Sequence, residues 1–92
     1  MNTYDVEYTD TFGGEANYCW VRRYSVTISE TYPDNDHKRK DTYYRELVRK
    51  AKALAGLTGV KCKREEYGDL IALYPHGSCT VLFISYREAN HE

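Results

Sequence analysis

The sequence predicts an α+β fold in which one helix packs on a face of an antiparallel β-sheet of four to five strands, in the order β-β-α-β-β-β. Three features support this fold class: an alternating segment at the N-terminus, an apolar stripe with helical spacing in the middle, and three short strand-like runs at the end. A chain of 92 residues has room for one hydrophobic core, so we expect a single domain over residues 1–92.

The first two runs predict a β-hairpin. Residues 3–9 alternate apolar and polar side chains, which is typical of a strand with one buried face. The Gly13-Gly14 pair supplies a turn, because glycine readily adopts positive φ. The following run, 17–29, is rich in β-forming residues. Its even-numbered aromatic and aliphatic residues are expected to share one face: Tyr18, Trp20, Tyr24, Val26 and Ile28.

A polar loop and then a helix are expected in the middle of the chain. Residues 30–40 keep no apolar period and contain the turn residues Pro33, Asp34 and Asn35. We predict a helix over 41–56, which Gly56 ends at its C-terminus. Asp41 or Thr42 would cap its N-terminus. One apolar stripe with helical spacing is expected to face the core: Tyr44, Leu47, Val48, Ala51, Leu54 and Ala55.

Three strand-like runs follow Gly59. Residues 60–64 alternate, residues 69–74 are mostly apolar, and a Pro-His-Gly turn follows at 75–77. The last run, 79–86, is apolar at consecutive positions. A strand that buries both of its faces has this pattern, so we expect it to be central in the sheet and covered by the helix on one side.

The cysteines and the N-terminus bear on the cellular location. Cys19, Cys62 and Cys79 are odd in number and lack a CxxC spacing, so we expect neither a disulfide nor a zinc site. Each lies in an apolar, strand-like context and is expected to be a small buried residue in the reduced form.

No stretch approaches the roughly 20 apolar residues of a membrane span, and the N-terminus lacks a signal-peptide pattern. We therefore expect a cytoplasmic protein with no membrane partner.

No residue pattern supports catalysis. Cys79 and His76 are a conceivable pair, but a strand cysteine beside a turn histidine is more often structural. Glu65, Glu66 and Asp69 lack the spacing of a calcium loop and fit a solvated turn better. The glycines match neither a P-loop nor a dinucleotide-binding motif. We expect no enzyme activity, no cofactor, no metal and no small-molecule substrate.

The charges are segregated along the chain. Ten of the thirteen basic residues and only two acids lie in residues 38–64, which gives this segment a net charge of +8. Residues 1–37 carry −5 and residues 65–92 carry −4. Such asymmetry indicates an anionic partner, either nucleic acid or an acidic protein surface. The alternatives are that the opposite charges pair within the fold, or that they are simply solvated.

The basic segment supplies the candidate binding residues. A predicted helix face with Arg45, Arg49 and Lys52, extended by a preceding basic loop, would follow a phosphate backbone. Nearby tyrosines would stack on bases or fill a pocket of the partner. The complementary acidic residues could instead mimic nucleic acid, although such a spread is more often a matter of solubility. The predicted partner- or nucleic-acid-binding residues are Lys38, Arg39, Lys40, Arg45, Arg49, Lys50, Lys52, Lys61, Lys63, Arg64, Tyr32 and Tyr43.

The segment from Asp10 to Arg23 (DTFGGEANYCWVRR), the short chain and the α+β pattern without known motifs together resemble small phage-encoded anti-CRISPR proteins of the type I-F class. This resemblance implies a protein that docks on the RNA-guided surveillance complex and blocks hybridisation or binding of target DNA. It implies Cas subunits as partners, with the guide RNA as a further candidate contact. No functional residue carries over from it. The alternative from the residues alone is a free-standing nucleic-acid-binding or regulatory module with a basic helix face.

Overall fold

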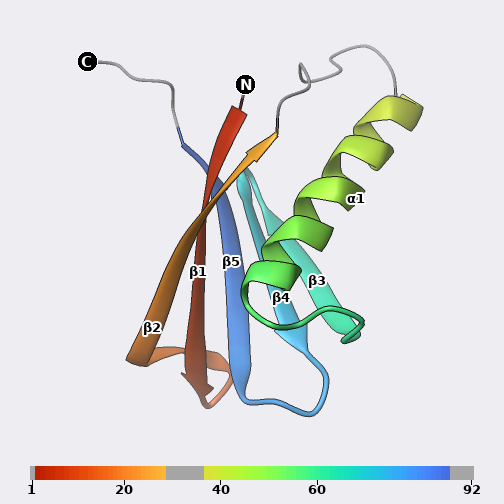
Figure 1. Cartoon of the computed structure of the whole chain (residues 1–92). Helices are drawn as coiled ribbons and strands as arrows, with labels where there is room; N and C mark the ends of the chain where they lie inside the picture. The colour runs from red at the N-terminus through yellow and green to blue at the C-terminus, as the bar shows by residue number, and fades with distance from the viewer. Residues whose placement is uncertain (1, 29–36, 88–92) are drawn as a thin grey trace.

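The computed structural model describes residues 2–28 and 37–87 and has five strands and one helix. All strand pairs are antiparallel, and the spatial order is β2-β1-β5-β4-β3. Helix α1 connects the two edge strands and lies across one face of the sheet (Figure 1). The predicted α+β class is therefore confirmed. The elements are β1 Asn2–Phe12, β2 Glu15–Ile28, α1 His37–Leu54, β3 Cys62–Tyr67, β4 Leu70–Pro75 and β5 Thr80–Tyr86.

Strands β1 and β2 form the expected hairpin, and its turn depends on glycine. Gly13 and Gly14 have φ of 64° and 85°, in the left-handed region that other residues avoid. The strand pairing shifts register between Thr9 and Thr11. Tyr18 also has a positive φ of 57°, which interrupts the alternation along β2. The prediction that Tyr18 shares a face with Val26 is therefore wrong, because Tyr18 lines a pocket on the sheet face away from α1.

The core lies between α1 and the facing side of the sheet. Val6 and Ile84 are paired neighbours on β1 and β5, and both are buried against Leu47 and Ala51 of the helix. Val81 and Leu82 point to opposite faces of β5, yet both side chains are fully buried. The prediction that the last strand is central and buried on both faces is confirmed.

Helix α1 begins at His37, four residues earlier than the predicted start at residue 41. Asp41 and Thr42 therefore lie inside the helix rather than at its cap, and the Thr42 Oγ1 donates to the carbonyl of Lys38 at 3.2 Å. The predicted basic loop 38–40 is also helical. The C-terminal end agrees better, since Gly56 has φ of 77° just after Leu54.

The buried stripe of α1 is rotated from the predicted one. Tyr43 is buried at 2% exposure, whereas Tyr44 is only half-buried and Leu54 is 44% exposed. A broad apolar stripe permits either orientation about the helix axis, and contact with Tyr4 of β1 selects the one with Tyr43 inside.

The expected burial of the cysteines is wrong. Cys19 and Cys79 are exposed and Cys62 is half-buried, all three as free thiols. Cys79 precedes β5 in the turn, and Cys19 lies in the part of β2 whose neighbours are also exposed. Strand-like sequence context alone does not bury a residue at the end of a strand. In the described part of the chain, no helix has the length and apolar character needed to cross a membrane.

Candidate binding surfaces

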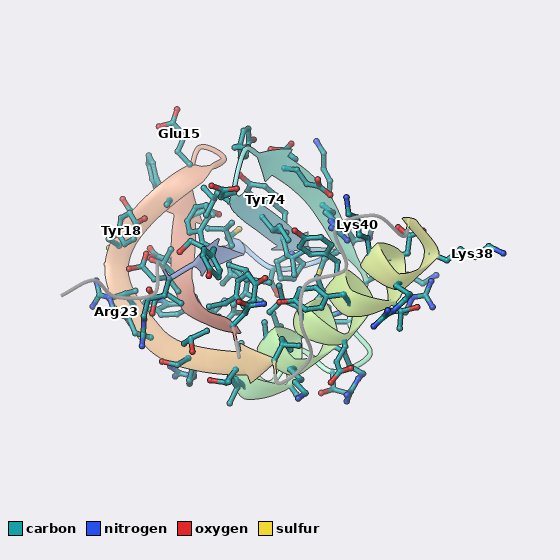
Figure 2. The ribbon with its side chains drawn as sticks, turned by 90° about the horizontal axis from the view of Figure 1, so that it is seen from above. Glu15, Tyr18, Arg23, Lys38, Lys40 and Tyr74 are labelled. Carbon is teal, nitrogen blue, oxygen red and sulfur yellow. The ribbon has the colours of Figure 1, made fainter. Side chains whose placement is uncertain are left out.

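The outward face of α1 carries two arginines whose charge is uncompensated. Arg45 and Arg49 lie one helical turn apart, and both are exposed. Neither forms an ion pair or hydrogen bond with another residue in the described ranges 2–28 and 37–87. Lys38 lies two turns before Arg45 on the same side of the helix. Its side chain points away from the sheet at the end of α1 (Figure 2). We call Lys38, Arg45 and Arg49 the basic face of α1.

Two other predicted helix cations have partners within the protein. Lys50 pairs with Glu46 at 3.3 Å, one turn before it on the helix. The ammonium group of Lys52 donates to the backbone carbonyl of Val60 at 2.5 Å and holds the segment that follows the helix. The prediction that Lys52 points into solvent beside Arg49 is therefore wrong. A lysine is half-buried when its aliphatic chain lies along the protein surface and its ammonium group binds a carbonyl. Lys52 is half-buried in this way.

The cations of β3 do not enlarge the basic face of α1. Lys63 and Arg64 are consecutive strand residues, so their side chains point to opposite faces of the sheet. Each pairs with an acid two residues further along the same face: Lys63 with Glu65 at 3.2 Å, and Arg64 with Glu66 at 2.9 Å. Lys61 is exposed just before the strand. Arg64 lies on the α1 side of the sheet, where it lines a pocket with Tyr44, but Glu66 neutralises its charge, and Lys63 lies on the other face.

The predicted aromatic contacts are not available either. The hydroxyl of Tyr43 is 2.9 Å from that of Tyr4 and accepts a hydrogen bond from the side-chain amide of Asn2 at 3.0 Å. Its ring is buried in the core, so it cannot stack on a base or enter a partner. The prediction that Tyr43 contacts a partner is therefore wrong, and this residue has a structural role. Tyr32 lies outside the described residues.

Several acidic residues are compensated inside the protein. Asp5 forms an ion pair with Arg87, and Glu7 pairs with Arg23 at 3.0 Å. Asp10 accepts hydrogen bonds from the Asn17 side chain and from the backbone of Cys19, and these bonds, led by that of Asn17, lower its pKa. This arrangement does not favour a carboxylate array that imitates nucleic acid.

A tyrosine-walled pocket of about 350 Å³ opens on the α1 side of the sheet. Tyr4 and Tyr86 form an edge-to-face pair with ring centroids 5.4 Å apart, and Tyr44 completes the aromatic wall. Arg64 and Glu66 line its opposite side as an ion pair. Sequence reasoning missed this pocket, because its residues come from five separate elements and no local spacing relates them.

The Tyr4 hydroxyl in this pocket is neutral at physiological pH. Burial is the main cause that raises the pKa of Tyr4, so its hydroxyl stays protonated and is not a nucleophile at neutral pH. Within residues 2–28 and 37–87, no three His, Cys, Asp or Glu side chains are grouped to hold a metal ion. His76 and Cys79 are both exposed in the turn before β5.

Comparison of the chain with protein-family models, with curated proteins and with solved structures finds no match.

Proposed function

We propose that this protein inhibits a type I-F RNA-guided surveillance complex by docking on it through the basic face of α1. One observation carries the interface: the charges of Arg45 and Arg49 are uncompensated, whereas Lys50, Lys63 and Arg64 are neutralised by neighbouring acids. The complex itself is taken from the resemblance of segment 10–23 to anti-CRISPR proteins. Guide RNA and acidic protein surfaces beside it are anionic partners that this face fits.

Lys38, the member of the basic face in the first turn of α1, has an unfavourable position with respect to the helix dipole. The first turn of a helix favours acids, and that of α1 contains lysine and arginine but no acid. Each cation there costs about 0.3–1 kcal/mol at an exposed position. Residues selected only for a stable helix would have the opposite charge. This placement therefore supports a role in recognition.

Charge alone gives attraction and orientation, and an apolar anchor must add affinity. Leu54 is the nearest candidate, because it lies at the end of the same helix and 44% of its surface is exposed. Its position next to Arg49 in a surface groove places an apolar group beside a cation. This combination is common at the centre of protein interfaces.

The test measures target-DNA binding by a purified type I-F surveillance complex, with and without an equimolar amount of the protein. We expect the wild type to block DNA binding and the double variant R45E/R49E to be at least tenfold weaker, because both reversals place acids against an anionic surface. Both side chains are exposed, so its melting temperature should stay close to that of the wild type. K61E/K63E is the matched control, with the same change in net charge away from α1.

Two results would contradict the proposal. If the wild type leaves DNA binding unchanged, the protein is not an inhibitor of this complex. If R45E/R49E inhibits as well as the wild type, the inhibitor function stands but the basic face of α1 is not its interface.

The same basic face also supports a second candidate, a free-standing nucleic-acid-binding module. In that case the protein would bind naked RNA or DNA, with an affinity that falls steeply as salt increases, because each phosphate contact releases counterions. A fluorescence-anisotropy titration at several salt concentrations separates the two. Tight binding to the assembled complex with little binding to naked nucleic acid favours the inhibitor.

A further inference from the structure

The outer edge of β2 faces a groove beside α1. Strand β2 lies at one edge of the sheet, and within the described residues its backbone pairs with β1 only. The register with β1 is regular along residues 21–28, so the backbone groups on the outer side of this stretch are presented in a regular row. A groove of about 370 Å³ separates the strand from the helix. It is lined by Ser25, Val26, Thr27, Arg49, Lys50, Ala53 and Leu54.

The two edge strands of the sheet differ in how they resist pairing with another chain. Strand β3 has six residues and four consecutive charges over 63–66, a pattern that discourages strand addition. Residues 25–28 of β2 carry no charge and end in two β-branched residues, Thr27 and Ile28. The first half of β2 is interrupted by the backbone conformation of Tyr18, so its second half is the available edge.

We propose that this groove binds an extended acidic segment of a partner protein, which adds to the sheet as a further strand alongside residues 22–28 of β2. Backbone hydrogen bonds to the strand edge would supply affinity, and alternate side chains of the segment would supply specificity. Side chains that point to the α1 side meet Ala53 and the exposed Leu54, with Arg49 next to them. A segment of seven residues spans about 23 Å at roughly 3.3 Å per residue.

The positive charge of the groove favours an acidic segment as its ligand. Arg49 is uncompensated and Lys50 is paired with Glu46, while none of the residues that line the groove is acidic. Arg22, on the same stretch of β2, lies over the ring of Trp20 with its guanidinium 5.6 Å from the ring centroid. If two copies of this chain paired through β2, the second copy would bring its own Arg22 and Arg49 to this already basic edge, where like charges repel. An acidic segment replaces this repulsion by attraction.

The probe is a capped eight-residue peptide of alternating Glu and Val, and the control is the same peptide with Lys in place of Glu. Both are titrated into the ¹⁵N-labelled protein. We expect the acidic peptide to shift the amide signals of residues 22–28 and of Ala53 and Leu54. The titration should give a Kd below about 1 mM, which corresponds to weak binding. Alternate amides of β2 should exchange more slowly with solvent in its presence. The Lys peptide should cause no shift at these residues.

Two variants separate this groove from the basic face of α1, to which Arg49 also belongs. A53E places a carboxylate in the groove and should weaken the acidic peptide at least tenfold. Ala53 is exposed, and Glu is a good helix former, so the fold should persist. R45E should bind the peptide as the wild type does, because Arg45 does not line the groove. If A53E loses the peptide but still blocks DNA binding by the surveillance complex, strand binding in the groove is not required for the proposed inhibition.

Three results would overturn the proposal: no shift with the acidic peptide at millimolar concentration, equal shifts with both peptides, or shifts confined to residues away from β2 and α1. A dimer in analytical ultracentrifugation that disappears when Thr27 is replaced by proline would show that a second copy occupies the edge instead.

Discussion

The hydroxyl pair of Tyr4 and Tyr43 connects the sheet to the helix in the core. The two oxygens are 2.9 Å apart, and the side-chain amide of Asn2 donates a second hydrogen bond to Tyr43. Tyr4 is 7% exposed, and its burial raises its pKa above the ordinary value near 10. The hydrogen bond with Tyr43 and the neighbouring tyrosines add to this shift. Tyr4 is therefore neutral and hydrogen-bonded at physiological pH.

This shift predicts a loss of stability in alkaline solution. The folded pKa of Tyr4 lies above the unfolded one, so its contribution is complete below about pH 10 and is lost as the pH rises through the folded pKa. Urea unfolding between pH 8 and 11 should show the free energy of unfolding falling above about pH 10. Tyr4→Phe should cost about 1 kcal/mol at pH 8 and reduce this alkaline decline. An unchanged decline in the variant would show that other groups cause it.

Helix α1 has one face for the core and another for solvent. Leu47 and Ala51 have no exposed surface, and Arg45 and Arg49 on the other side are exposed. Packing and the proposed recognition of a partner would therefore use different residues. Substitutions on one face should leave the other function intact.

A matched pair of substitutions tests this separation. Leu47→Asp buries a carboxylate that has no partner in the core, which costs more than the stability of a typical small domain can absorb. Arg45→Asp makes a similar change on the exposed face. We expect Leu47→Asp to lose the cooperative thermal transition followed by circular dichroism, and Arg45→Asp to melt within a few degrees of the wild type. Equal melting temperatures for the two variants would contradict the observed orientation of α1.

At the scale of the whole molecule, the hairpin, the helix and the C-terminal strands contribute to one hydrophobic cluster. Residues of β1, β2, α1, β4 and β5 all belong to it. Because no element has a core of its own, none should persist when the others unfold. Trp20 reports on the hairpin end of the sheet, where its ring is 5.4 Å from that of Tyr8, and far-ultraviolet circular dichroism reports on α1.

We therefore predict that unfolding is two-state. The urea transition followed by Trp20 fluorescence should coincide with the transition followed by circular dichroism at 222 nm, a wavelength that reports mainly helix, within about 0.2 M of urea. An earlier fluorescence transition would show that the β1–β2 hairpin opens before the helix and the remaining strands.

The amino-acid sequence by itself determined which elements form and in what order. The alternation at Tyr4, Val6 and Tyr8, the helical spacing of Leu47 and Ala51, and the apolar run in β5 are local patterns, and each matches the element observed. These patterns are readable because a strand repeats every two residues and a helix every 3.6, whatever the rest of the chain does.

Only the tertiary structure decided which side chains are available at the surface. Tyr43 is buried rather than exposed, because packing against Tyr4 selects the rotation of α1. The ammonium group of Lys52 donates to the backbone carbonyl of Val60, eight residues away. Arg45 has no ion pair or hydrogen bond within the described residues. The groove between β2 and α1 joins residues that are more than 20 positions apart in the chain. Whether a side chain is available to a partner depends on which distant residue lies opposite it. The packing of the strands against the helix decides this, and the residue spacing within one element does not.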